Sequence, residues 1–247
     1  MKLSVIAGLL LSLTGCASLY TPPSTSTEAE STAVRQSNSR MELGLGYLTQ
    51  GDMIRARKNL EQALQHAPDY YRAQLSMAYY YETVGDTQTA AERYRQTLKQ
   101  HPRNGQVLNN YGTFLCKQGK FDLADIYFNK ALHQPDYYQV DATYENAAFC
   151  ALKAGEKDHA AHYFQQALNH NPNRWRSLSQ LTYLDLEQQH YSQARQRLLQ
   201  FQDVWGVQPA SLELLILVEE KAGNTAQKTT YQDQLLALNE PSPFNDH

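Results

Sequence analysis

Glycine recurs through most of the chain at a nearly constant interval, and this spacing constrains the fold more than any other feature. Gly51, Gly85 and Gly119 are 34 residues apart, and Gly155 follows after 36. A repeat of this length holds two antiparallel helices of about 13 residues and a tight turn. Glycine suits that turn because it accepts the positive φ at which many helices end. The spacing therefore predicts an all-α chain of helix–turn–helix units stacked in a row.

A second set of residues recurs in register with the glycines. A small residue stands seven positions before the glycine in each of four units, at Gly44, Ala78, Gly112 and Ala148. Alanine and then an aromatic residue or leucine follow the glycine, as in Ala124 and Phe128. This pattern resembles the tetratricopeptide repeat (TPR). The resemblance implies a TPR solenoid of about six repeats, wound as a right-handed superhelix with a concave groove.

The register divides the chain into six units, near residues 37–70, 71–104, 105–140, 141–174, 175–208 and 209–240. The fifth unit has Gln189 at its turn, and the sixth keeps Gly223 but has Lys228 where earlier units have alanine. Terminal repeats are often atypical because their outer face must be capped. We therefore expect the sixth unit to be a repeat or a capping helix pair, followed by a loose tail over residues 241–247.

The N-terminal segment has the layout of a secretory signal. Lys2 precedes an apolar run over residues 3–13, which is shorter than the roughly 20 residues that span a bilayer. Leu-Thr-Gly-Cys, ending at Cys16, resembles a bacterial lipobox. The resemblance implies that residues 1–15 are removed, that Cys16 is lipidated, and, because Ala17 follows it, that the anchor lies in the outer membrane. The alternative is an ordinary signal peptide with a chance cysteine.

Residues 17–39 are rich in serine, threonine, proline and alanine and show no apolar period. Such a composition favours a flexible coil, and a coil of roughly 20 residues reaches about 25 Å. We therefore expect a lipidated tether over residues 16–36, followed by the TPR domain over residues 37–240.

Charge and motifs favour a binding protein over an enzyme. The formal net charge is −3 and the chain has no basic run, which argues against a nucleic-acid partner. The sequence has no His-Glu-x-x-His, no glycine-rich phosphate loop and no nucleophile elbow. His159 and His162 lie three residues apart, but no third ligand stands at a supporting spacing. We expect no metal, no cofactor and no small-molecule substrate.

Cys116 and Cys150 occupy near-equivalent positions in the first helices of the third and fourth units. Adjacent helices pack about 8–10 Å apart, so two facing cysteines could reach the Cα separation of roughly 4.4–6.8 Å that a disulfide requires. The oxidising compartment of an exported protein would permit the bond. We expect a disulfide. The alternatives are two buried free thiols, or an enzyme that uses one of these cysteines as a nucleophile.

Several polar and aromatic residues of the first helices are candidates to face the groove. Asparagine can bond the main chain of an extended peptide, and tyrosine can pack on its side chains. Each candidate could equally pack between repeats. The candidates are Tyr79, Asn109, Asn110, Thr113, Asn146 and Tyr183.

Features from nearly the whole chain combine in a more specific resemblance. The lipobox, the tether, the repeats and the stretches NNYGTFLCKQGKFDLADIYFNKAL and ENAAFCALKAGEKDHAAHYFQQAL resemble the type IV pilus biogenesis lipoproteins of the PilF/PilW family. The resemblance implies a pilotin on the periplasmic face of the outer membrane. Such a protein binds the pilus secretin, promotes its localisation and multimerisation for pilus assembly and twitching motility, and catalyses nothing. The alternative is a TPR lipoprotein that scaffolds cell-wall enzymes or outer-membrane protein assembly.

Overall fold

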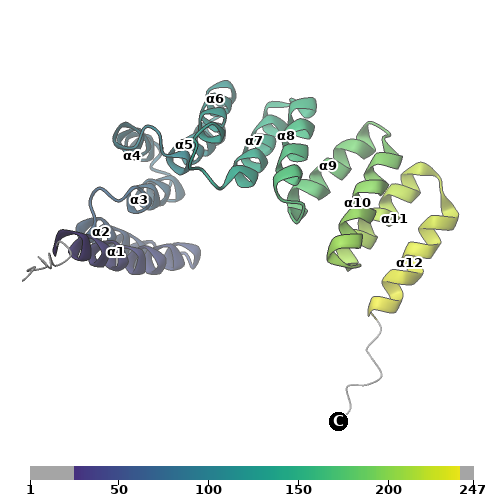
Figure 1. Cartoon of the computed structure of the whole chain (residues 1–247), viewed down its shortest axis with the longest axis horizontal. Coiled ribbons are helices and arrows are strands. Elements are labelled where there is room, and N and C mark those ends of the chain that lie inside the picture. The colour runs from purple at the N-terminus through teal and green to yellow at the C-terminus, as the bar shows by residue number, and fades with distance from the viewer. Residues whose placement is uncertain (1–24, 240–247) are drawn as a thin grey trace, which may run out of the picture.

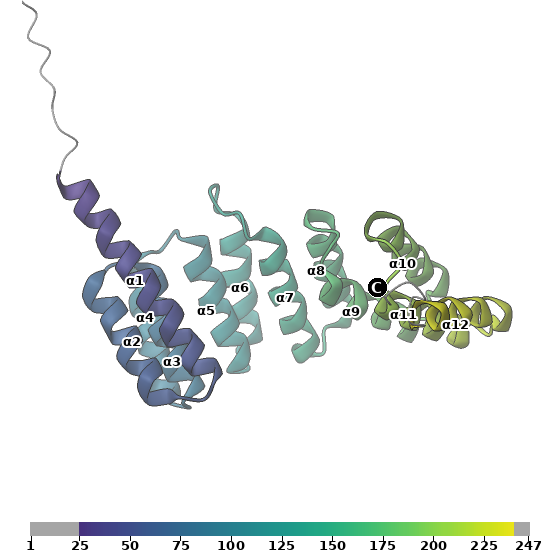
Figure 2. The same ribbon diagram turned by 90° about the horizontal axis from the view of Figure 1, so that it is seen from below.

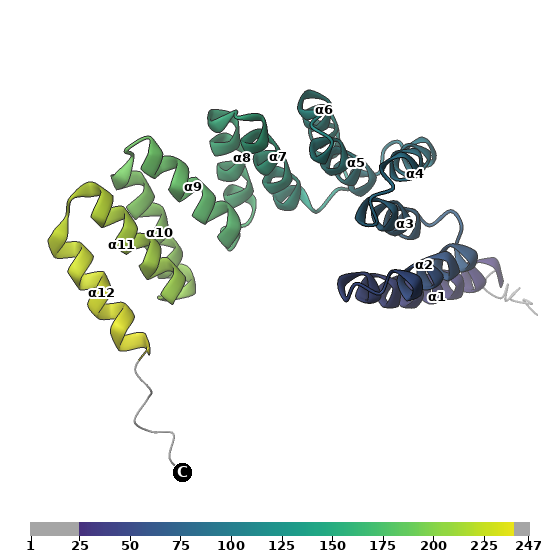
Figure 3. The ribbon, with the colours of Figure 1, turned by 180° about the vertical axis from the view of Figure 1, so that it is seen from behind.

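A computed structural model describes residues 25–239, with side chains from Thr32 onward. That part of the chain contains helices and no strand. The helices follow one another along the molecule in chain order, so that the first and last lie at opposite ends (Figures 1 and 3). They are α1 (Thr25–Thr49), α2 (Met53–His66), α3 (Tyr71–Thr83), α4 (Thr87–Gln100), α5 (Gly105–Lys117), α6 (Phe121–Leu132), α7 (Val140–Ala154), α8 (Lys157–His170), α9 (Trp175–Glu187), α10 (Tyr191–Trp205), α11 (Pro209–Ala222) and α12 (Thr225–Asn239).

Each odd-numbered helix pairs with the even-numbered helix after it, and each pair packs on the next. The pairs therefore form six helix–turn–helix units, and this part of the chain is an all-α solenoid, as the glycine spacing predicts. The first helices of the second to sixth units begin at Tyr71, Gly105, Val140, Trp175 and Pro209. None of the helices between residues 25 and 239 is both long and apolar enough to cross a bilayer.

The first helix begins earlier than its composition suggests. Because α1 starts at Thr25, the flexible coil expected over residues 16–36 is wrong for residues 25–36. This stretch has no apolar stripe, yet it extends a helix that is already packed, and extending a helix costs far less than starting one. Figure 2 shows the N-terminal part of α1 projecting past the neighbouring helices. The expected signal segment, Cys16 and the expected tail over residues 241–247 lie outside the described residues.

The repeated small residues lie where helices approach closely. A Cβ atom on Gly112 would come within 2.9 Å of the Phe128 ring, and both Gly112 and Phe128 are buried. Ala124 on α6 is also fully buried beside them. A larger residue at position 112 would therefore push α5 and α6 apart, so the periodic small residues set the spacing within each unit.

The turns between paired helices share one backbone conformation. Five of them place glycine at φ values between 73° and 83°, at Gly51, Gly85, Gly119, Gly155 and Gly223. The turn after α9 has Gln189 there, at φ 62°. Residues with a Cβ are disfavoured in this left-handed region by roughly 1–2 kcal/mol. The turn of the fifth unit is therefore strained where the others are relaxed.

Changing Gln189 to glycine is expected to stabilise the protein by up to about 1 kcal/mol, because relief of strain exceeds the entropy that glycine loses on folding. Urea unfolding followed by circular dichroism measures the change. Gln188→Gly is the matched control, because Gln188 has φ −88° and gains nothing from losing its Cβ. Equal effects of the two changes would show that φ at position 189 is not the cause.

Candidate functional site

A groove of about 340 Å³ lies between the first helices of the first three units. Three consecutive odd-numbered helices contribute to it, so the stacking of the repeats creates the site. Its lining residues are Met41 and Leu45 from α1, Arg72, Leu75, Ser76 and Tyr79 from α3, and Gln106 and Asn110 from α5.

Apolar and polar groups both line the groove. Met41, Leu45 and Leu75 provide an apolar surface, and the side chain of Tyr79 is 44% exposed. The Asn110 side-chain amide donates to the carbonyl oxygen of Gln106 at 2.7 Å. An amide has further donor and acceptor capacity beyond one such bond. The groove can therefore take an apolar side chain and also hydrogen-bond the main chain that carries it.

The ionised side chain in the lining of this groove, Arg72, is basic. Hydrogen bonding by Tyr70 raises the pKa of the Arg72 guanidinium, so the side chain is a permanent cation. Lys117 lies 5.7 Å from the centroid of the Tyr79 ring, within the range of a cation–π contact. Its Nζ also lies 2.6 Å from a carboxylate oxygen of Glu82. Arg72 is therefore the cation in the lining that could meet an acidic group on a ligand.

The structure places the candidate groove residues in three different settings. Tyr79 and Asn110 line the groove together. Asn109 does not: it is only 7% exposed, and its side-chain oxygen accepts a hydrogen bond from the Asn146 amide at 3.1 Å. Thr113 donates to the carbonyl oxygen of Asn109 at 3.0 Å. Asn109 and Asn146 thus belong to the packing between α5 and α7, whereas the Thr113 hydroxyl is bonded within α5.

The remaining candidate, Tyr183, is 46% exposed on α9 and is not among the residues that line this groove. Tyr183 occupies the same place in the fifth unit as Tyr79 does in the second. Tyr183 follows Arg176 by seven residues, and Tyr79 follows Arg72 by seven residues. The two tyrosines therefore offer a matched pair, one inside the groove and one outside it.

Sequence reasoning missed most of the groove lining. Residues 34 positions apart are equivalent in the first three units. One equivalent set is Met41, Leu75 and Asn109, and another is Leu45, Tyr79 and Thr113. Following each position through all units would have found Met41, Leu45 and Leu75. The signal was therefore present in the register, although no single residue type marks it.

Cys116 on α5 and Cys150 on α7 form a disulfide in the structure, with their Cα atoms 5.7 Å apart. Both residues are buried. The bond ties α5, which contributes Gln106 and Asn110 to the groove, to the first helix of the fourth unit.

The histidine pair on α8 has no metal-like surroundings. His159 Nδ1 lies 3.1 Å from a carboxylate oxygen of Glu156, and both side chains are largely exposed. Between residues 25 and 239, no three histidine, cysteine, aspartate or glutamate side chains gather in a way that could hold a metal ion.

Comparisons with known proteins agree with the fold. A family model described as "Tetratricopeptide repeat" matches residues 75–138. An uncharacterized protein of Haemophilus influenzae is 39% identical over 130 residues, which are 53% of this chain and 70% of the relative. The type IV pilus assembly protein PilF of Pseudomonas aeruginosa is 29% identical over 188 residues, which are 76% of this chain and 74% of the relative.

Two solved structures are similar over most of the chain. The structure of Pseudomonas aeruginosa PilF has a TM-score of 0.65 at 28% identity and covers 85% of this chain and 95% of its own. The structure of PilW, described as a widely conserved type IV pilus biogenesis factor, has a TM-score of 0.64 at 27% identity. The match covers 84% of this chain and 95% of the PilW chain. Fold and groove thus define a TPR solenoid protein. Within that class, sequence and fold together make it a PilF/PilW-like TPR protein.

Proposed function

We propose that this protein is a type IV pilus biogenesis factor that holds an extended segment of a partner protein in the groove between α1, α3 and α5. The observation that carries the proposal is the groove itself, where an exposed tyrosine and a side-chain amide stand beside an apolar surface. PilF is a type IV pilus assembly protein and PilW a type IV pilus biogenesis factor, which gives the process in which such a groove would act. Binding of this kind needs no catalysis and no cofactor.

The partner in this proposal is the pilus secretin, and the protein acts as its pilotin. A lipid on Cys16 would hold the repeats at the periplasmic face of the outer membrane, where secretin subunits must arrive and multimerise. The groove chemistry suits a segment with one large apolar side chain and a nearby acidic or neutral residue, because Arg72 is a permanent cation in the lining.

Tyr79→Ala together with Asn110→Ala is expected to weaken secretin binding at least about tenfold, because a truncated anchor and a lost amide partner each cost roughly 1 kcal/mol or more. The readout is the amount of heat- and detergent-resistant secretin multimer in outer-membrane fractions. Tyr183→Ala is the matched control, since it removes an equally exposed tyrosine outside the groove. Circular dichroism of each purified variant checks that the fold is intact.

The same assay tests the pilotin role and the anchor. Multimers should be lost on deletion of the protein and mislocalised with Cys16→Ala. Normal multimers in every strain would contradict the pilotin proposal. The alternative would then be a TPR lipoprotein that scaffolds cell-wall enzymes or outer-membrane protein assembly, and pull-down of envelope partners would identify which.

A further inference from the structure

A second pocket, of about 330 Å³, lies on another part of the solenoid and is formed by α8, α9 and α10. It shares no residue with the groove described above. We refer to it as the α8–α10 pocket. Its apolar lining consists of Leu168, Pro172, Leu178, Phe201, Val204 and Trp205.

The repeats supply an internal reference for this pocket. Three units earlier, α2, α3 and α4 form a pocket of about 270 Å³ at the equivalent place. Four lining residues of that earlier pocket recur unchanged: Leu64, Pro68, Arg93 and Gln96 correspond to Leu168, Pro172, Arg197 and Gln200. The other shared positions change from polar to apolar: Gln74, Thr97 and Gln100 are replaced by Leu178, Phe201 and Val204.

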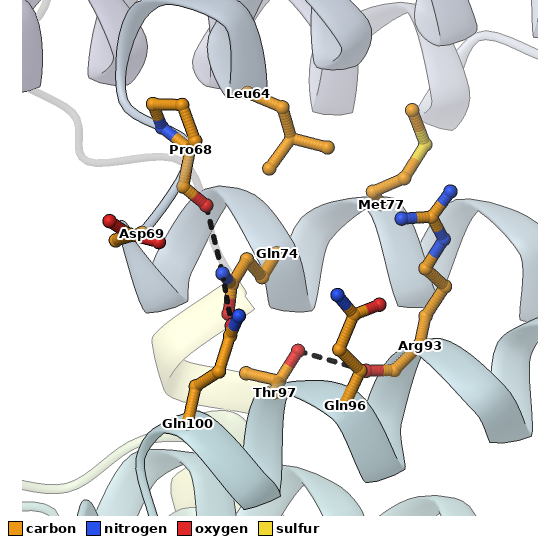
Figure 4. Close-up of a pocket in the computed structure, with 9 residues that line it drawn as sticks. All are labelled: Leu64, Pro68, Asp69, Gln74, Met77, Arg93, Gln96, Thr97 and Gln100. Atoms are coloured by element: carbon orange, nitrogen blue, oxygen red, sulfur yellow. Dashed lines mark hydrogen bonds between the residues drawn. The ribbon is translucent and has the colours of Figure 1, made fainter.

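In the earlier pocket, the polar side chains are hydrogen-bonded to other groups of the lining. Gln74 Nε2 donates to the Pro68 carbonyl oxygen at 2.8 Å and to Gln100 Oε1 at 2.6 Å (Figure 4). Leucine and valine at the equivalent positions of the α8–α10 pocket cannot form such a bridge. Val204 is instead 67% exposed and Trp205 44% exposed. Covering this apolar surface would stabilise a complex in proportion to the area removed from water.

The lining of the α8–α10 pocket contains no unpaired ionised side chain. Arg197 is its only ionisable lining residue, and its guanidinium is paired with the buried carboxylate of Asp185. The Arg197 Nε also donates to Gln165 Oε1 at 3.1 Å. A charged ligand group entering the pocket would lose its water without gaining a counter-ion. The pocket therefore favours an uncharged group.

Side-chain amides surround this apolar surface. Gln165 Nε2 donates to Asn169 Oδ1 at 3.0 Å, and Gln200 also contributes to the lining. Amide groups keep further donors and acceptors that match the main chain of a peptide. An acyl chain has no groups that could use them. The chemistry thus points to a peptide rather than a lipid as the occupant.

We propose that the α8–α10 pocket docks an uncharged aromatic or branched aliphatic side chain from a peptide segment of a partner protein. Tryptophan is enriched among the residues that carry most of the binding energy at protein interfaces, and Trp205 lines this pocket. Since the pocket and the α1/α3/α5 groove have no residue in common, the protein can hold two segments at once. The proposal does not depend on the identity of the segment in the groove.

The test uses small probes of defined chemistry and methyl NMR of the full chain. N-acetyl-L-phenylalaninamide and N-acetyl-L-leucinamide are expected to shift the Leu168 and Leu178 methyl signals saturably, with millimolar affinity as befits their size. The leucine-sized but charged N-acetyl-L-aspartic acid amide should not. The Leu64 methyls report on the earlier pocket in the same spectra.

Matched variants exchange residues between equivalent positions of the two units, where Gln100 lines the earlier pocket and His101 follows it at the end of α4. Val204→Gln with Trp205→His installs the residues found at Gln100 and His101, and should weaken probe binding at least tenfold. The reciprocal Gln100→Val with His101→Trp should create probe binding seen at Leu64. Each double variant introduces side chains that the protein already has at the equivalent positions of the other unit.

Three results would overturn the proposal. The first is the absence of saturable shifts at Leu168 and Leu178, or equal binding of the aspartate probe. The second is displacement of the apolar probes by decanoate at lower concentration, which would make an acyl chain the occupant. The third is self-association in analytical ultracentrifugation that Val204→Gln with Trp205→His abolishes, which would make a second copy the occupant.

Discussion

Replacing Arg195 with methionine is expected to destabilise the protein by about 3–5 kcal/mol, the usual cost of leaving one member of a buried ion pair alone. Glu219 on α11 is completely buried. Both of its carboxylate oxygens are bonded by the Arg195 guanidinium from α10, with Nη2 at 2.7 Å from Oε2. The substitution therefore leaves a buried carboxylate without its counter-ion. Urea unfolding at pH 7, followed by circular dichroism, measures the loss.

A double variant separates the buried charge from the lost packing. Arg195→Met with Glu219→Leu removes both ionised groups and should recover most of the stability, because an apolar pair often replaces a buried ion pair without loss. A single variant as stable as the wild type would show that water reaches Glu219. A double variant as unstable as the single one would show that the packing of the arginine stem, and not the charge, holds α10 on α11.

Removing the disulfide is expected to cost up to about 4 kcal/mol, the value that the chain-entropy model gives for the loop it closes. Cys116 and Cys150 are 34 residues apart in sequence. For a chain of this size the loss corresponds to a fall in the thermal midpoint of about 8–16 °C. The measurement is thermal unfolding of the wild-type protein with and without a thiol reductant.

Cys116→Ala with Cys150→Ala is the control for the reductant. Alanine keeps these buried positions apolar, and the variant should unfold at the same temperature in both buffers. A wild-type protein that ignores the reductant, and whose two thiols react with a labelling reagent before reduction, would show that no bond forms. It would also revive the possibility of two buried free thiols.

The periodic part of the fold follows from the sequence because turns and contacts repeat. Glycine at φ values near 80° ends the first helix of most units, and Gly112 must be small because Phe128 touches it. Both constraints act within one unit, so a single sequence can reveal them. Gln189 adopts the same turn without glycine, and the turn keeps the equivalent backbone hydrogen bond, from the His190 N–H to the Asp185 carbonyl oxygen at 2.7 Å.

Two features could not be predicted so directly. Asn109 and Asn110 are adjacent, and consecutive residues of a helix point about 100° apart. One therefore packs against α7 while the other lines the groove. Residues 25–36 lack an apolar period, so the sequence offers no sign that α1 extends through them. The first outcome depends on packing between units and the second on extension of a helix from its packed part, and repeat spacing specifies neither.

The early start of α1 has a consequence for how a partner is met. Residues 25–36 are helical and continuous with the helix that lines the groove, and a helix rises 1.5 Å per residue. This extension therefore fixes the direction of the groove relative to the point where α1 begins. Under the proposed anchoring at Cys16, only residues 17–24 would separate the lipid from this rigid rod. The groove would then search a restricted set of orientations, which raises its effective concentration for a partner held in the same membrane.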